Sequence, residues 1–220
     1  MSASRSDKIL ELKRLLADRF GESEIADEAV FHTGLPTLDG IGVPKGALSE
    51  LVGSGPGSTL LLHALLHAML GRNERAILID GKTGFAPTSL PQAELNRLLW
   101  VRCRNAGEAI KAADLAVRDG NLPLVVMLLS LNSASELRRI SATAWHRLNV
   151  MAEKSGVALL VFTPQAQIGC ARLRVLVGGA FPLERLHLLR SELIADVEVK
   201  VQRRRVGRRH DEELRDVACA

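Results

Sequence analysis

The chain has 220 residues, 47% of them apolar, which is enough to bury the core of one domain. Its net charge of +4 and sequence pI of about 9.2 allow a nucleic-acid or acidic protein partner without requiring one. Aromatic residues make up 3% of the chain, which disfavours recognition of single strands by base stacking. Three widely spaced cysteines suit neither a disulfide framework nor a zinc site, so we expect no metal and no cofactor.

The N-terminus is polar, and no apolar run is long enough to span a bilayer. We therefore expect a cytoplasmic protein with no membrane partner. Residues 6–19 predict a helix, with an apolar stripe formed by Ile9, Leu12, Leu15, Leu16 and Phe20. A polar stretch follows, so residues 1–27 form an N-terminal helix and linker. This helix either docks on a partner or a second copy, giving self-association, or folds onto its own domain.

Residues 48–62 have the order of a phosphate-binding loop. Residues 48–52 predict a buried strand, a glycine-rich turn follows, and an apolar helix covers residues 59–70. A working loop reads G-x-x-x-x-G-K-[ST], because the lysine holds the phosphates and the hydroxyl holds Mg²⁺. Here the spacing from Gly53 to Gly57 is one residue short, and Ser58 precedes Thr59 where the lysine should be.

The next part of the chain alternates apolar strands with amphipathic helices. Strands are expected at residues 76–80, 98–102, 124–129 and 157–162, with a short helix or turn at 90–97. Asn105 and Glu108 cap a helix that Gly120 ends, and Ser133 and Glu136 open one long helix that ends at Gly156. Strands that are apolar on both faces indicate a mostly parallel sheet with helices on both sides.

The two ends of the core have other patterns. Residues 28–47 carry turn residues and predict a loop with one short strand at 29–31. Strict alternation at residues 172–177 and 196–201 predicts half-exposed antiparallel edge strands, with a turn or strand at 182–189 between them. The core domain therefore covers residues 28–202, and residues 203–220 are expected to be a basic, disordered tail.

Several segments, taken in order, resemble the nucleotide-binding core of the RecA recombinase family. They are residues 33–39, residues 43–46, residues 48–53, the strand that ends at Asp80, the strand 124–129 and residues 162–165. The resemblance covers about residues 28–202. It implies an α/β fold of the RecA-like, doubly wound kind, with a mostly parallel sheet, helices on both faces and antiparallel edge strands toward the C-terminus.

The same resemblance implies which positions carried catalysis in the family. Ser58 stands for the lysine that binds the phosphates, Leu129 for the aspartate that holds the magnesium-bound water, and Lys82 for the catalytic glutamate. Ser130 and Gln165 match the family, in which the glutamine senses the γ-phosphate. Because a charged lysine cannot act as a general base, and leucine cannot bind a metal, we expect no ATP hydrolysis. Binding of a nucleotide or anion by the backbone N–H groups stays open.

Taken with its size and basic C-terminus, the chain is similar to the ImuA family of RecA-like accessory proteins. That resemblance implies a non-catalytic adaptor in damage-induced mutagenic translesion DNA synthesis, part of the SOS response, bound to an ImuB-like homologue of Y-family polymerases. DNA or RecA are further partners to test. The alternatives are a cell-division inhibitor of the SulA type, which binds FtsZ, and a RecA-like protein that still binds ATP.

Other side chains have a structural and a functional interpretation. His63 and His67 are four residues apart, as in a metal pair, but a place on the polar side of a covering helix is the simpler interpretation. Glu50 recurs in the RecA pattern, so we expect a structural role for it. The most concentrated charge is a set of arginines that either solvates the tail or contacts a phosphate backbone or an acidic partner. These are Arg203, Arg204, Arg205, Arg208 and Arg209.

Overall fold

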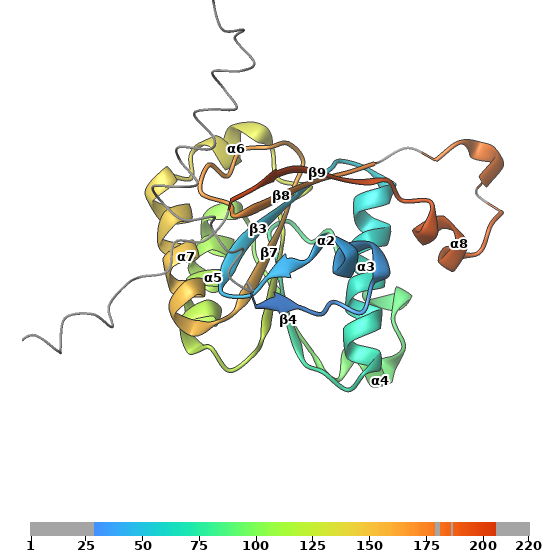
Figure 1. Ribbon diagram of the computed structural model, residues 1–220, viewed down its shortest axis with the longest axis horizontal. Helices are drawn as coiled ribbons and strands as arrows, with labels where there is room; N and C mark the ends of the chain where they lie inside the picture. Colours follow the sequence, from blue (N-terminus) through green and yellow to red (C-terminus); the bar gives the residue numbers. More distant parts are fainter. Residues whose placement is uncertain (1–28, 179–180, 186, 206–220) are drawn as a thin grey trace, which may run out of the picture.

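A seven-stranded sheet forms the centre of the computed structural model, which describes residues 29–178, 181–185 and 187–205 (Figure 1). The strand order is β5-β4-β6-β7-β3-β8-β9, in which β9 alone runs antiparallel to its neighbour. The strands are β3 (Ala47–Val52), β4 (Ala76–Asp80), β5 (Leu98–Arg102), β6 (Leu124–Leu128), β7 (Ala158–Thr163), β8 (Leu173–Val177) and β9 (Val199–Arg204). The fold is therefore α/β with a mostly parallel sheet, consistent with the RecA-like architecture. The expected N-terminal helix lies outside the described residues.

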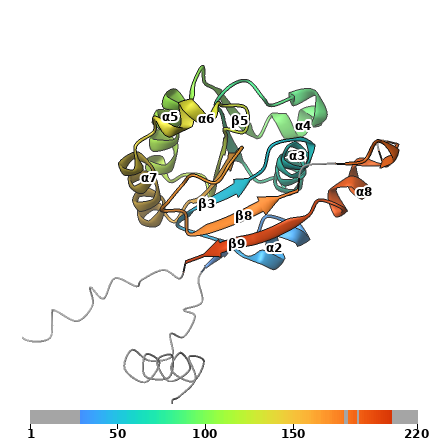
Figure 2. The same cartoon turned by 90° about the horizontal axis from the view of Figure 1, so that it is seen from above.

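Helices cover both faces of the sheet because its central strands are apolar on both sides. In β6, Val126 and Leu128 pack toward α3 (Pro56–Gly71), whereas Val125 and Met127 pack toward the opposite helices. Those helices are α5 (Ala106–Asp119) and α7 (Ala142–Ser155), which lie side by side (Figures 1 and 2). Each face thus buries its own apolar cluster, as two-sided burial of parallel strands requires.

Asn105 and Gly120 bound α5 as predicted, but the Glu108 carboxylate accepts from the Arg104 N–H and not from that of Asn105, so the expected capping box does not form. The long helix predicted after β6 is two helices. Asn105 Oδ1 accepts a hydrogen bond from the Glu108 N–H, and Gly120 ends α5 with a φ of 69°. The predicted helix from Ser133 to Gly156 was wrong, because α6 (Ala134–Arg138) stops early. Ser141 then caps a second helix, α7, by accepting from the Ala144 N–H at 3.2 Å. A Ser side chain can accept hydrogen bonds from the N–H groups of a first helical turn, so Ser141 favours the start of a new helix over the continuation of α6.

Residues 30–44 form more structure than the expected loop. Strands β1 (Val30–Phe31) and β2 (Val43–Pro44) pair antiparallel around helix α2 (Pro36–Ile41). Asp39 fixes this unit, because its carboxylate accepts hydrogen bonds from the N–H and hydroxyl of Thr33 at 2.7 and 2.8 Å. Between β4 and β5 lie a short 3-10 helix (Pro87–Ser89) and α4 (Gln92–Leu95), as expected for a short helix or turn.

The C-terminal strands correct the expected tail. Helix α8 (Arg190–Ala195) was not predicted; it follows a 3-10 turn (Leu183–Arg185). Strand β9 then pairs with β8 as far as Arg204, so Arg203 and Arg204 belong to the sheet (Figure 2). The expected boundary at residue 202 falls inside this strand. Arg208 and Arg209 lie outside the described residues.

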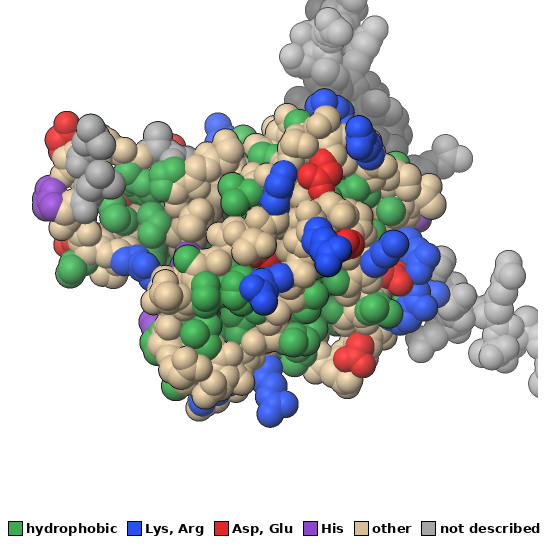
Figure 3. Space-filling model, turned by 180° about the vertical axis from the view of Figure 1, so that it is seen from behind, with side chains coloured by type: hydrophobic (Ala, Val, Ile, Leu, Met, Phe, Trp, Pro, Cys, Tyr) green, Lys and Arg blue, Asp and Glu red, His purple; other side chains and the backbone are tan. Residues whose placement is uncertain are grey.

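The opposite edge of the sheet is β5, which lies on the side shown in Figure 3. There, apolar side chains gather with lysines and arginines among them (Figure 3). Leu99 of β5 is 56% exposed, and Arg102 lies over the ring of Trp100. Over the described ranges, no helix has both the length and the apolar character needed to cross a membrane.

Candidate functional site

The loop between β3 and α3 lies at the carboxyl end of the parallel sheet. Strand β3 lies inside the sheet, between β7 and β8, and ligands of open α/β sheets bind outside the carboxyl ends of the strands. Gly55 has a φ of 122° and directly precedes Pro56, the first residue of α3. The loop therefore keeps the strand–turn–helix path of a phosphate site, and Pro56 offers no N–H.

Ser58 is turned back into the loop. Its side chain is buried, and its Oγ has no hydrogen-bond partner among the described residues. A Cβ on Gly53 would lie 2.4 Å from this oxygen and 2.7 Å from the Val177 carbonyl oxygen. The hydroxyl thus fills the space beside Gly53, whereas Thr59 is exposed.

Asp80 holds the loop after β4 through its carboxylate. It accepts hydrogen bonds from the N–H groups of Gly84 at 2.9 Å and Phe85 at 3.0 Å, and from the indole of Trp100 at 3.3 Å. Because these donors surround a fully buried carboxylate, Asp80 shapes the turn on which Lys82 lies. Lys82 itself is exposed. The pKa of Glu136 is lowered mainly by the hydrogen bond from the Ala106 N–H, and the charge of Lys82 adds to this effect.

The remaining positions that the RecA resemblance singled out differ in burial. Leu129 is fully buried in the apolar cluster beneath α5 and α7, so its side chain belongs to the core. Ser130 Oγ is buried and has no partner among the described residues, and Gln165 is exposed. No side chain at these positions can supply a negative charge for Mg²⁺, since oxygen ligands and carboxylates are what that ion requires.

Glu50 is a buried carboxylate that accepts four hydrogen bonds. Its Oε1 accepts hydrogen bonds from the Thr163 hydroxyl and from the N–H groups of Gln167 and Ile168, at 2.9 to 3.1 Å. Its Oε2 accepts from Arg174 Nε at 2.6 Å, and the carboxylate is fully buried. The predicted structural role is confirmed: Glu50 joins β3, β8 and the loop after β7.

The described arginines of the basic set differ in their contacts. Arg203 donates to the carbonyl oxygens of Ile168 and Ala171, and burial, with Arg174 and Arg205 nearby, lowers its pKa. Arg204 donates to the carbonyl oxygens of Ile41 and Gly42, at the end of α2. Both arginines therefore hold the fold, which corrects their assignment to a tail. Arg205 is exposed, and a contact role for it stays a prediction.

The two histidines of α3 have separate partners. His63 is buried, contrary to its expected place on a polar face; its Nδ1 lies 2.7 Å from Ser89 Oγ, and its ring stacks on Phe85. His67 Nδ1 lies 2.9 Å from the carboxylate of Glu94. No group of three or more potential metal-ligating side chains occurs in the part of the chain that the structure describes.

Two hollows beside α5 and α7 were not predicted, because they depend on how helices that are separate in sequence pack together. One, of about 480 Å³, lies between these helices and is lined by Ile110, Ala144 and Arg147 among others. The other, of about 730 Å³, continues toward α6. Capping residues in the sequence predict where a helix starts, but they do not predict how far that helix lies from another.

No family model matches the chain, and no curated protein matches it.

Proposed function

We propose that the chain is a non-catalytic adaptor with a RecA-like fold, of the kind that binds an ImuB-type polymerase homologue in mutagenic translesion DNA synthesis. The observation that carries this proposal is a loop that keeps the strand–turn–helix path of a phosphate site but lacks the side chains that bind phosphate and metal. Ser58 Oγ fills the space next to Gly53, and a buried Leu129 stands where a metal-binding carboxylate would be needed.

The charge at these positions supports the same conclusion. Lys82 is a cation where a general base is required, and Asp80 is already surrounded by backbone and indole donors. A carboxylate satisfied in this way gains little by turning toward a metal ion, because it would leave buried N–H groups unpaired. With several independent losses, a single compensating group would not restore phosphoryl transfer.

Binding to the ImuB-type protein, measured by calorimetry with the full chain, tests the proposal. We expect saturable binding and no DNA-stimulated ATP hydrolysis. Lack of binding, or hydrolysis that a Thr59→Ala change abolishes, would contradict it. FtsZ polymerisation assays in the presence of the chain separate the SulA-type alternative, since an adaptor leaves the polymerisation rate unchanged.

A further inference from the structure

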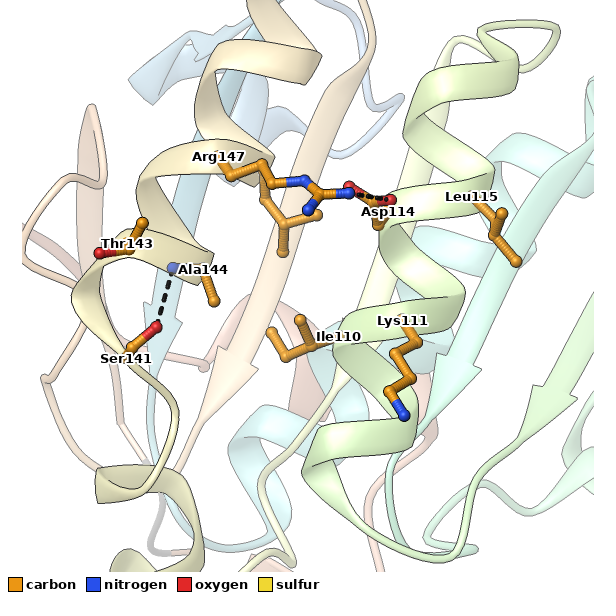
Figure 4. A pocket seen from close by; sticks show the side chains of 9 residues that line it. Ile110, Lys111, Asp114, Leu115, Ser141, Thr143, Ala144 and Arg147 are labelled. Atoms are coloured by element: carbon orange, nitrogen blue, oxygen red, sulfur yellow. Dashed lines mark hydrogen bonds and ion pairs between the residues drawn. The ribbon is translucent and has the colours of Figure 1, made fainter.

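A groove separates α5 from α7 on the outer surface of the domain (Figure 4). Its volume is about 480 Å³, and a second hollow of about 730 Å³ adjoins it toward the start of both helices. The two share Ile110, Lys111, Ser141 and Ala144, so they form one continuous depression. We call this depression the α5–α7 groove.

The floor of the α5–α7 groove is apolar. Ile110 and Ala144 point into the space between the helices (Figure 4). The buried Leu148 also lines the groove, as does Leu115 of α5, which is 69% exposed. A depression of this size with an apolar floor can take several side chains of another segment.

The rim of the groove is basic where it widens. Lys111 and Arg139 are exposed, and neither side chain forms an ion pair with a described residue. At the other end, Arg147 crosses from α7 to Asp114 of α5 at 2.8 Å (Figure 4). Arg118 binds the same carboxylate oxygen. Within the described part of the chain, two cations outside any ion pair therefore border the groove.

The charge pattern selects among possible occupants. The apolar floor gives a phosphate backbone little to bind, because such a backbone is contacted through cations and N–H donors. The charges beside the chain's own N-terminal stripe are of both signs, with Glu11 and Asp18 among Lys8, Lys13 and Arg19, so they do not match a rim of two cations. The carboxylates of Asp114 and Glu136 along the groove are already held by Arg118 and Arg147 and by the Ala106 N–H. An amphipathic segment with acidic side chains therefore matches both the apolar floor and the two cations of the rim.

We propose that the α5–α7 groove binds an amphipathic segment of the partner protein, with apolar side chains on the floor and Asp or Glu side chains at Lys111 and Arg139. This inference rests on the proposed adaptor function and names the surface through which it acts. Complementary charge at a rim governs the association rate and its salt dependence, while the apolar floor supplies affinity.

Charge reversal of the rim tests the inference. The double variant Lys111→Glu/Arg139→Glu is titrated with the ImuB-type protein and compared with Lys45→Glu/Arg75→Glu, which makes the same charge change at exposed positions away from the groove. We expect the groove variant to bind about tenfold or more weakly, and to lose most of the salt dependence, while the control binds like the wild type. Ala144→Trp, which fills the floor, should weaken binding to a similar degree.

A photo-reactive residue at the exposed position Thr143 provides a second measurement in an otherwise unchanged chain. We expect cross-links to a segment of the partner that carries both apolar and acidic residues. If the wild type binds the partner and all groove variants bind equally well, the groove is not the docking surface, although the adaptor function stands. If the wild type does not bind at all, both proposals fail. Cross-links to DNA or to a second copy of the chain would also overturn the assignment of the occupant.

Discussion

Ser58 and Gly53 show at the scale of single residues how the loop has become a packed turn. The buried Ser58 hydroxyl has no hydrogen-bond partner among the residues that the structure describes, and the surroundings of the Gly53 Cα leave no room for a methyl group. We expect Gly53→Ala to lower the free energy of unfolding by about 1–3 kcal/mol, because the Val177 carbonyl is backbone and cannot move away. Ser58→Ala should be neutral or stabilising, since it removes an unsatisfied polar atom. Urea unfolding of both variants measures this; a loss of stability in Ser58→Ala would show that the hydroxyl is satisfied.

His63 makes stability depend on pH. Burial, with the Arg190 guanidinium nearby, holds the pKa of His63 below its ordinary value, so the fold favours the neutral ring. The unfolded chain therefore binds more protons, and the free energy of unfolding falls as the pH drops below about 6.5. His63→Gln should reduce that slope between pH 7.5 and 5, whereas His146→Gln, at an exposed position, should leave it unchanged. Equal slopes in the wild type and both variants would refute this role.

Single residues also show the limit of what the sequence can predict. Glu50 could be assigned a structural role from its place in a buried strand, but Arg174, its partner, is 124 residues away. Arg203 and Arg204 were predicted to belong to a charged tail, because the carbonyl oxygens that accept their hydrogen bonds lie in segments far away in the sequence. Charge composition describes solvation well, but it does not identify hydrogen bonds between separate segments.

At the scale of elements, Glu50 and Arg174 couple β3 to β8 and to the loop after β7. Removing one partner of a buried pair leaves an uncompensated charge, so Glu50→Ala should destabilise the chain by about 3–5 kcal/mol. Arg174→Met in the same chain should recover part of that loss, because the unpaired cation is then gone. A double-mutant cycle by chemical denaturation measures the coupling. If the effects of the two changes on the free energy of unfolding are additive, Glu50 and Arg174 are not energetically coupled.

Elements were predictable where local signals acted alone. Apolar runs in the sequence predict the strands β4, β5 and β6. The start of α5 follows from Asn105, whose side chain accepts a hydrogen bond from the N–H group three residues later. The helix after Ser133 was predicted as one because its apolar stripe continues through Ile140. Ser141 caps a new helix within this stretch. The spacing of apolar residues does not reveal such a cap, because the apolar stripe continues on both sides of it.

For the whole molecule, the loop at Gly53 predicts a lack of response to nucleotide. A working site with 100-fold excess of ligand over its dissociation constant would stabilise a fold by about 2.7 kcal/mol. We expect 1 mM Mg-ATP to leave the melting temperature unchanged, because Ser58 and Leu129 offer no charge to phosphate or metal. Differential scanning calorimetry with and without Mg-ATP provides the comparison. A rise of several degrees would show that the loop still binds nucleotide.

The fold class was predictable for the same chain, since strands apolar on both sides need two helical layers. The candidate binding surface was not, because the α5–α7 groove arises from helices that are separate in sequence. Partner contacts were expected at the chain ends, where charge is concentrated. The structure adds a surface in the middle of the chain.

The neighbourhood of Gly42 brings the first and last described strands together. Val30 and the Arg204 guanidinium both lie within 3.6 Å of the place that a Cβ on Gly42 would occupy. When the two ends of a domain lie close together, as β1 and β9 do, a circular permutation of the chain is tolerated. A circular permutant in which a short linker joins Arg205 to Ala29, and the chain opens in the turn after Gly120, should therefore fold with the same circular dichroism spectrum and a cooperative melt.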